Sequence, residues 1–224
     1  MCGRFTRYYT WAEIHRLYRL TAPESNFQPR YNICPTTNID VVIPSVEQQG
    51  LMPMRWGLIP GWWNKPLKEM KLATFNARAE TVAEKPIFRD SFKRRRCLIP
   101  ISGYYEWQDT PNGKQPYYFT RSDGEVMTIA GLWSDWTEKA TGEKLWSCTM
   151  IITAANEFVG EVHDRMPVIL ESHNFEPWLS CKIGMELLTP AENHVLQRRP
   201  VSKRVNSSRA SDDDAALIEK VTFK

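Results

Sequence analysis

Short segments of β-branched and aromatic residues, separated by tight-turn signals, fill the middle of the chain and limit the folds it can adopt. Pro-Asn-Gly at 111–113, Ser-Asp-Gly at 122–124 and Thr-Gly at 141–142 each lie between two such segments, and glycine after a small polar residue is typical of a β-turn. Strands joined by short turns pair antiparallel, because a parallel crossover needs a longer connection. The predicted strands are Ile39–Pro44, Leu51–Gly57, Cys97–Ile101, Tyr104–Gln108, Tyr117–Arg121, Val126–Trp133, Leu145–Thr153 and Met166–Leu170.

One amphipathic helix is expected over residues 10–20. Thr10 followed by Glu13 is a capping-box pattern, and apolar residues recur at helical spacing from Trp11 to Tyr18. Shorter helices are expected at 87–94, 154–162, 175–179 and 191–197. Because strands outnumber helices, the sequence predicts an α+β fold with a curved, mostly antiparallel, partly barrel-like sheet flanked by short helices.

Length, charge and cysteine use narrow the class of protein. The 224 residues contain no repeat and no long Pro-, Gly- or Ser-rich linker, which favours a single domain over residues 1–224. A net charge of +3 permits nucleic acid as a partner without requiring it. No window approaches the roughly 18 apolar residues of a membrane span. Five scattered cysteines without a CxxC motif argue against structural zinc and against a disulfide framework, so we expect a cytoplasmic protein without metal or cofactor.

Cys2 stands directly after the initiator methionine, and removal of Met1 would leave an α-amine beside a thiol. Such an amine, with a pKa of about 7.7–8.0, condenses with an aldehyde to an imine, and the thiol can then close a five-membered thiazolidine. The same residue could instead serve as an N-terminal nucleophile of a hydrolase, with the amine as base. Taken alone, a cysteine at position 2 more often has no catalytic role than has one, so the other candidate residues must decide whether Cys2 is reactive.

Two titratable residues stand in settings that suit catalysis. Glu106 lies among aromatic residues in a predicted strand, where burial would raise its pKa toward that of a general acid or base; a surface glutamate on the polar face of that strand fits equally well. His163 is followed by Asp164 and Arg165 just before a strand, and an imidazole can shuttle the protons that imine chemistry requires. A lone histidine is more often structural, but the other three have no such setting.

Several polar residues could hold a nucleic acid. Gly3 would let a substrate backbone approach closely, and Arg4 offers a guanidinium to a phosphate. Asn76, Arg78 and Glu80 alternate along a stretch that, if extended, puts all three on one face. An amide can hold a sugar hydroxyl and an arginine a phosphate, although a solvated strand edge explains the same pattern.

Trp62 and Trp63 form an aromatic pair in a loop rich in turn formers. Exposed rings can stack on unpaired bases, and single-strand binders combine such platforms with phosphate-binding arginines. A hydrophobic plug beneath a long loop is the alternative. Basic runs at 93–96 and 198–199 are interpreted as solvated surface.

Eight short segments spread over nearly the whole chain share a known pattern. They are MCGR at the start, YNICP at 31–35, RWGLIPGWW at 55–63, NARAET at 76–81, CLIPISGYYEW at 97–107, ITAAN at 152–156, VHDRMP at 162–167 and VSKRVN at 201–206. In this order they resemble the SOS response-associated peptidase (SRAP) family, whose members shield abasic sites. The resemblance implies that Met1 is removed and that Cys2 forms a crosslink with the ring-opened aldehyde of an abasic site in single-stranded DNA.

The resemblance also implies roles for individual residues. Asn76 would hold the opened sugar, Glu106 would assist proton transfers, and His163 would act as general acid or base. The residues expected to contact DNA are Gly3, Arg4, Pro35, Trp62, Trp63, Arg78, Thr153 and Arg165. Among them, Arg78 and Arg165 would bind the flanking phosphates.

Trp62, with Pro35 nearby, would wedge the base stack so that duplex continues on one side only. The implied partner is therefore single-stranded DNA with an abasic site, including sites at junctions with duplex. We expect a monomer that associates with the nucleoid when it is bound to damaged DNA. Two other functions stay open: a cysteine peptidase, which at minimum removes Met1, and a non-covalent single-strand binding module.

Cys34 departs from the family pattern, which has a small apolar residue before Pro35. If Pro35 lines the site, a second thiol lies near Cys2, and a disulfide between the two under oxidation would stop crosslinking. Mass spectrometry after mild oxidation tests this hypothesis, which fails if Cys2 stays free.

Overall fold

Five strands close into a small barrel in the computed structural model, which describes residues 2–20, 24, 26–44 and 50–222. The strand order is β10, β4, β3, β6 and β9, and β9 pairs again with β10 to complete the ring. Their bounds are β3 (Asn38–Ile43), β4 (Gly50–Trp56), β6 (Arg96–Ile101), β9 (Met127–Thr137) and β10 (Lys144–Ala154). Two short strands, β5 (Asn76–Arg78) and β11 (Arg165–Pro167), add to β10.

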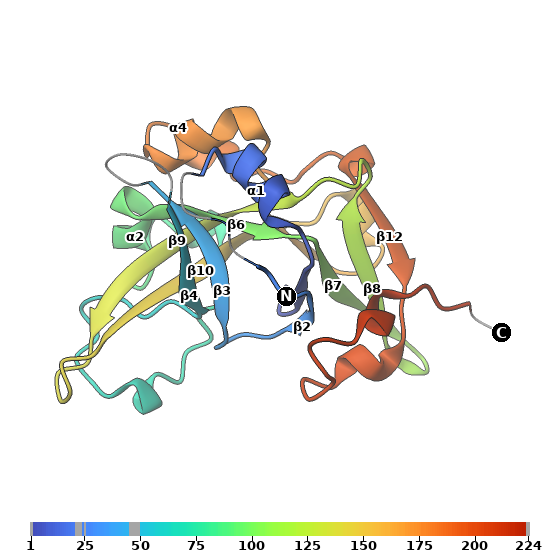
Figure 1. Ribbon diagram of the computed structural model, residues 1–224, viewed down its shortest axis with the longest axis horizontal. Helices are drawn as coiled ribbons and strands as arrows, with labels where there is room; N and C mark the ends of the chain where they lie inside the picture. Colours follow the sequence, from blue (N-terminus) through green and yellow to red (C-terminus); the bar gives the residue numbers. More distant parts are fainter. Residues whose placement is uncertain (1, 21–23, 25, 45–49, 223–224) are drawn as a thin grey trace.

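A second, five-stranded sheet lies beside the barrel (Figure 1). Its strands, all antiparallel, follow the order β12 (Leu196–Pro200), β8 (Gly113–Arg121), β7 (Gly103–Thr110), β1 (Phe5–Arg7) and β2 (Arg30–Ile33). Parallel pairing is confined to β10 with β4 and with β5 among the described strands. The predicted α+β class, with a mostly antiparallel and partly barrel-like sheet, is confirmed.

Short helices cover the outside of the barrel. α1 (Trp11–Tyr18), α2 (Arg89–Arg94) and α4 (Phe175–Leu179) gather at one end of it in Figure 1, whereas α3 (Glu157–Gly160) follows β10. Ile14, Phe92 and Trp178 from these helices pack with buried residues of the barrel strands in one apolar cluster. The remaining helical turns are 3-10 turns: η1 (Leu67–Glu69), η2 (Ala79–Thr81), η3 (Ser172–Asn174), η4 (Met185–Leu187), η5 (Asn193–Val195), η6 (Lys203–Asn206) and η7 (Ala215–Ile218).

Local signals in the sequence predicted several of these elements. Thr10 caps α1 in a capping box: its hydroxyl accepts from Glu13 N at 3.3 Å, and Thr10 N donates to Glu13 Oε2 at 2.5 Å. Gly113 and Gly142 turn their hairpins with positive φ of 88° and 72°, values that glycine adopts without strain. Serine, aspartate and glycine at 122–124 instead join β8 to β9, which lie in different sheets.

Two predicted helices were wrong in whole or in part. Residues 191–197 form only the η5 turn, because Leu196 is already paired with Arg121 as the first residue of β12. The helix predicted over 154–162 shrinks to α3, since Ala154 still pairs with Arg165 and Asn156 caps the helix through a bond from Val159 N at 2.8 Å. Long-range strand pairing overrides the helical spacing in both places.

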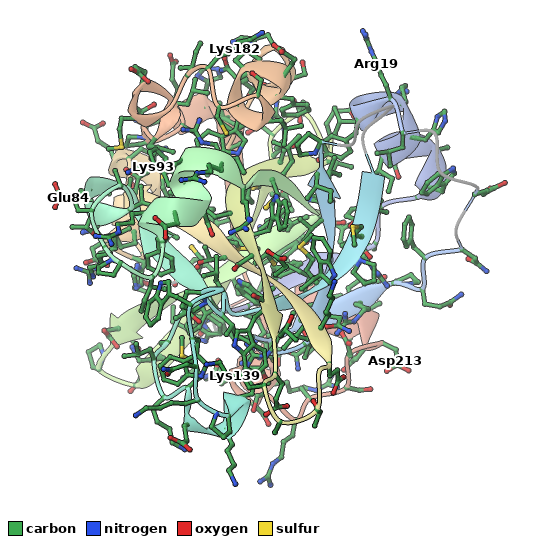
Figure 2. The ribbon with its side chains drawn as sticks, turned by 90° about the vertical axis from the view of Figure 1, so that its left-hand side faces the viewer. Arg19, Glu84, Lys93, Lys139, Lys182 and Asp213 are labelled. Atoms are coloured by element: carbon green, nitrogen blue, oxygen red, sulfur yellow. The ribbon has the colours of Figure 1, made fainter. Side chains whose placement is uncertain are left out.

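Most charged side chains point outward, as Glu84, Lys93, Lys139 and Lys182 do in Figure 2. Arg96 contradicts the interpretation of the run at 93–96 as solvated surface. It is buried, and its guanidinium lies 4.5 Å from the ring centroids of both Phe92 and Trp178. Along the described part of the chain, no helix is long and apolar enough to cross a membrane.

A candidate active site around Cys2

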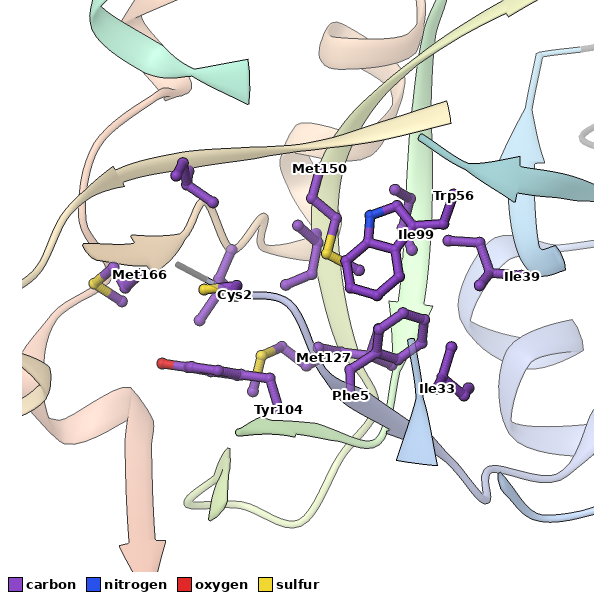
Figure 3. Packing of buried hydrophobic residues seen from close by; sticks show 14 of the residues in the cluster. Cys2, Phe5, Ile33, Ile39, Trp56, Ile99, Tyr104, Met127, Met150 and Met166 are labelled. Atoms are coloured by element: carbon purple, nitrogen blue, oxygen red, sulfur yellow. The ribbon is translucent and has the colours of Figure 1, made fainter. Parts of the chain in front are cut away.

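Cys2 lies where the barrel and the second sheet meet. The residue is 2% exposed and belongs to a core cluster with Tyr104 from β7, Met150 from β10 and Met166 from β11 (Figure 3). Pairing of Phe5 in β1 with Tyr104 draws the preceding residues into this cluster. The thiol is thus held in the interior, with side chains of both sheets around it.

Asn76 fixes the backbone of Cys2. At the start of β5, which pairs in parallel with β10, its Nδ2 donates to the Cys2 carbonyl oxygen at 2.9 Å. The other polar atom of this amide, Oδ1, is buried and has no hydrogen-bond partner among the described residues. Asn76 therefore holds the Cys2 backbone in place and retains an acceptor for a ligand.

Glu106 is fully buried on β7, at 0% exposure. Burial raises the pKa of its carboxyl, while the charge of His163 acts in the opposite direction. The surface-glutamate interpretation is therefore wrong. A carboxyl of this kind exchanges protons closer to neutral pH than an ordinary glutamate does.

His163 faces Glu106 from the turn before β11. Its Nε2 lies 3.8 Å from Glu106 Oε2, and its Nδ1 accepts a hydrogen bond from the backbone nitrogen of Arg165 at 3.0 Å. The backbone N–H of Arg165 requires a lone pair on Nδ1, which favours the tautomer with its proton on Nε2, toward Glu106. Asp164 Oδ1 lies 3.0 Å from the same Nδ1 and favours a proton there instead, so the two contacts of Nδ1 favour opposite tautomers.

Burial, followed by the charge and hydrogen bonding of Glu106, raises the pKa of the Cys2 thiol well above its usual value. The sulfur is therefore a neutral thiol at physiological pH. Cys34, which is half-buried, donates instead to Asn32 O at 3.4 Å, and both cysteines are free thiols. Their pairing under oxidation stays a prediction.

Two arginines stand beside the site and share one carboxylate. Arg78 is exposed and pairs with Ile152, while Arg165 pairs with Ala154 farther along the same strand β10. Arg165 Nη1 forms an ion pair with Glu80 Oε1. Desolvation opposes ionisation of Glu80, but its backbone hydrogen bond, Arg165 and Arg78 together lower its pKa.

The strand predicted to put Asn76, Arg78 and Glu80 on one face ends at Arg78, and Glu80 already lies in η2. The 3-10 turn therefore carries Glu80 off the strand face. It brings the carboxylate to Arg165 on β11, a pairing that the sequence spacing did not indicate.

Arg4 holds the fold together in the free protein. Its Nη1 donates to Asn32 Oδ1 at 2.5 Å and to Val205 O at 2.8 Å, and the guanidinium lies 5.8 Å from the ring centroid of Trp107. These contacts tie the start of the chain to β2 and to the VSKRVN segment near its end. A phosphate contact by Arg4 stays a prediction, as do contacts by half-buried Gly3 and Pro35 and by buried Thr153.

Trp62 is 53% exposed, which excludes a buried plug for this ring, whereas Trp63 is half-buried. The centroids of the two rings lie 6.4 Å apart. Both line a pocket of about 610 Å³ that also includes Ile87, Arg95 and Lys139. A second pocket of about 380 Å³ is lined by Asn76, Arg78, Lys85, Ile87 and Leu72, among other residues. Ile87 belongs to both, so the aromatic pocket adjoins the one that reaches Asn76.

Four of the predicted residues are thus brought together: Cys2, Asn76, Glu106 and His163. Tyr104, which was not predicted, borders the same place. It stands two residues before Glu106 on β7, so both side chains point to the same face of the strand. That alternation was visible in the sequence, but a tyrosine in a core strand carries no signal of its own.

Comparison with known proteins identifies the family. The family model described as "SOS response associated peptidase (SRAP)" matches residues 1–208. Abasic site processing protein YoqW of Bacillus subtilis is 36% identical over 98% of this chain and 99% of its own length, and abasic site processing protein HMCES of Xenopus tropicalis is 34% identical over 86% and 67%. A crystal structure from Bacteroides thetaiotaomicron superposes with a TM-score of 0.88 at 24% identity, covering 99% of this chain and 100% of that one, and shows the same fold. The chain belongs to the SOS response associated peptidase (SRAP) family.

Proposed function

We propose that this protein captures abasic sites in single-stranded DNA by forming a thiazolidine between Cys2 and the ring-opened sugar aldehyde. The observation that carries the proposal is the convergence of Cys2, Asn76, Glu106 and His163 from four separate segments. Relatives that align over nearly their whole length are named abasic site processing proteins, which supports the substrate.

Removal of Met1 turns the backbone nitrogen of Cys2 into a primary amine. The amine attacks first, because the raised pKa keeps the Cys2 sulfur protonated and poorly nucleophilic. Loss of water from the adduct gives an imine. The thiol then adds to the imine carbon while its proton passes to the nitrogen, and the five-membered ring closes without any further leaving group.

Glu106 and His163 serve the proton transfers of this sequence. An abasic sugar is mostly a closed hemiacetal, so opening it requires a proton at the ring oxygen and removal of one from the anomeric hydroxyl. The imidazole of His163 and the buried carboxyl of Glu106 lie 3.8 Å apart between their nearest atoms, and between them they give and take these protons. Glu106 also relays the thiol proton to the imine nitrogen during ring closure, since it is the carboxyl that hydrogen-bonds Cys2.

Ring closure protects the strand. An imine at an abasic site acidifies the neighbouring carbon and leads to β-elimination, which breaks the DNA. The thiazolidine has no C=N bond, so this route is closed while the crosslink lasts. Capture by an amine alone would lead to cleavage of the strand, whereas capture by amine and thiol together preserves it.

Arg78 and Arg165 bind the phosphates next to the lesion, and Trp62 stacks on an unpaired base. Their places around Asn76 and the two adjoining pockets support a path for a single strand. Pro35 and Trp62 limit duplex to one side, which suits junctions of single- and double-stranded DNA. The protein acts as a monomer on DNA in the cytoplasm, without a cofactor.

The test uses an oligonucleotide in which one uracil has been excised. We expect a band that survives a denaturing gel with the wild type and with Cys34→Ala, and no such band with Cys2→Ala. The intact mass of the purified protein must show Met1 removed. Binding that survives Cys2→Ala but vanishes on denaturation would replace covalent capture by simple single-strand binding, and retained Met1 together with crosslinking would refute the amine-first mechanism.

A further inference from the structure

Tyr104 carries a buried hydroxyl for which the described part of the chain offers no hydrogen-bond partner. The side chain is 1% exposed, and its Oη forms no hydrogen bond with any described residue. Its ring stacks on Phe119 with centroids 5.0 Å apart and planes within 8°, so its orientation is fixed. A phenylalanine would pack equally well, and an unsatisfied buried hydroxyl costs stability.

This hydroxyl lies at the candidate active site. In Figure 3 the ring of Tyr104 points away from Ile33 and Phe5, with its oxygen on the side of the cluster where Cys2 and Met166 lie. Burial raises the pKa of Tyr104, and the nearby charges of Cys2 and Glu106 raise it further. The group is therefore a neutral hydroxyl at physiological pH, able to donate a hydrogen bond but not to act as a base.

Tyr105, the next residue, shows the contrast. It faces the opposite side of β7, packs in a different apolar cluster and donates from its hydroxyl to Tyr31 O at 2.8 Å. Of two adjacent buried tyrosines, the one that turns away from Cys2 is satisfied within the protein and the one that borders Cys2 is not.

We propose that Tyr104 is a substrate-contacting residue whose hydroxyl donates a hydrogen bond to the hydroxyl that the abasic sugar releases on ring opening. This inference rests on the proposed function, since the aldehyde must reach Cys2 for the sugar to reach Tyr104. A sugar hydroxyl both accepts and donates. Asn76 Oδ1, which likewise has no partner among the described residues, offers a matching acceptor.

Such a contact gives selectivity among aldehydes. A linear aldehyde without the extra hydroxyl would leave Tyr104 Oη unsatisfied in the complex, whereas the ring-opened sugar satisfies it. Sites built to hydrogen-bond a substrate hydroxyl reject analogues that lack it, because the buried polar group is then left unpaired. Tyr104 would therefore favour the abasic sugar over other aldehydes in DNA.

The test compares Tyr104→Phe with Tyr105→Phe on two single-stranded oligonucleotides. One carries an abasic site, and the other carries an aliphatic aldehyde on a linker without a hydroxyl. We expect Tyr104→Phe to slow crosslinking to the abasic site by about 3- to 10-fold, and to leave the rate with the linker aldehyde unchanged. Tyr105→Phe should change neither rate.

Thermal unfolding gives an independent measurement. Tyr104→Phe removes an unpaired buried hydroxyl and should raise the melting temperature by about 2 to 4 °C, whereas Tyr105→Phe leaves the Tyr31 carbonyl without its donor and should lower it. Equal slowing of both substrates by Tyr104→Phe, no slowing of either, or a lowered melting temperature would overturn the inference. Absence of crosslinking by the wild type would instead refute the proposed function and leave the stability comparison valid.

Discussion

Glu80 neutralises an arginine that is expected to bind DNA. Its carboxylate pairs with Arg165 and interacts electrostatically with Arg78, so the two arginines proposed to bind phosphates present less positive charge than their number suggests. If Arg165 binds a phosphate as proposed, Glu80 competes with the phosphates of intact DNA for its guanidinium. We predict that Glu80→Gln, which keeps the shape of the side chain and removes its charge, binds undamaged single strands more tightly than the wild type.

The magnitude follows from the exposure of the pair. The Glu80 side chain is 49% exposed, so the ion pair is worth no more than about 1 kcal/mol. If Arg165 makes an interaction of the same strength with a phosphate, the affinity for single-stranded DNA rises by up to about 5-fold. One added phosphate contact steepens the salt dependence of log K on a single strand by about 0.7, so between 50 and 200 mM salt the advantage should shrink by about 2.6-fold.

Fluorescence anisotropy with an intact labelled oligonucleotide measures the effect, because no aldehyde is present and the covalent step does not intervene. Glu176→Gln, in α4, is the matched control: it also removes a carboxylate paired with a cation, Lys182 at 3.1 Å, and Lys182 lies on the outer surface (Figure 2). Both variants raise the net charge by one, but only Glu80→Gln frees an arginine at the site. The gain should vanish when Arg165→Gln is added.

Equal affinities and equal salt slopes for Glu80→Gln and Glu176→Gln would refute this reasoning. So would a loss of affinity in Glu80→Gln at an unchanged slope, since that result would assign Glu80 a purely structural role in aiming Arg165. Only a gain that depends on both salt and Arg165 identifies competition with phosphate.

Two further predictions concern residues with opposite exposure. Because the pKa of Glu106 is raised in the folded protein, its favourable contribution to folding stability is present below the unfolded-state pKa of about 4.3 and is lost as pH rises through the folded-state pKa. Glu106→Gln should therefore raise the melting temperature at pH 7 to 8, and the difference from the wild type should vanish near pH 4. The same substitution should slow crosslinking. Trp62→Ala should weaken single-strand binding by about 5-fold or more in anisotropy, and leave the melting temperature nearly unchanged, since the ring is 53% exposed. Unchanged affinity would place the stacking elsewhere.

Features set by neighbouring residues could be predicted from the sequence. The capping box of Thr10 and Glu13 marks α1, and the turns at Gly113 and Gly142 mark two hairpins, because each signal acts over a few residues. The burial of Glu106 was not fixed in this way, because its neighbours fit a buried and a surface glutamate equally well and only the packing of the two sheets decides between them.

Features set by distant pairings could not be predicted in the same way. β12 exists because Leu196 meets Arg121, and the Arg165–Glu80 pair exists because β5 and β11 both join β10. The engagement of Arg4 with Asn32 and Val205 depends on a chain end more than two hundred residues away. Neither periodicity nor spacing carries information of this kind, whereas the order of family motifs indicated the site residues without giving their contacts.

The word peptidase in the family's description raises the question of which chemistry the site favours. A cysteine peptidase needs a thiolate, which enzymes obtain by placing a cation or a helix N-terminus beside the sulfur. Here burial and Glu106 act in the opposite direction on the Cys2 thiol. Before Met1 is removed, the backbone nitrogen of Cys2 is part of an amide, so Cys2 has no α-amine that could deprotonate its thiol. This environment supports the proposed order of steps, in which a neutral thiol adds late to an imine that the amine has already formed.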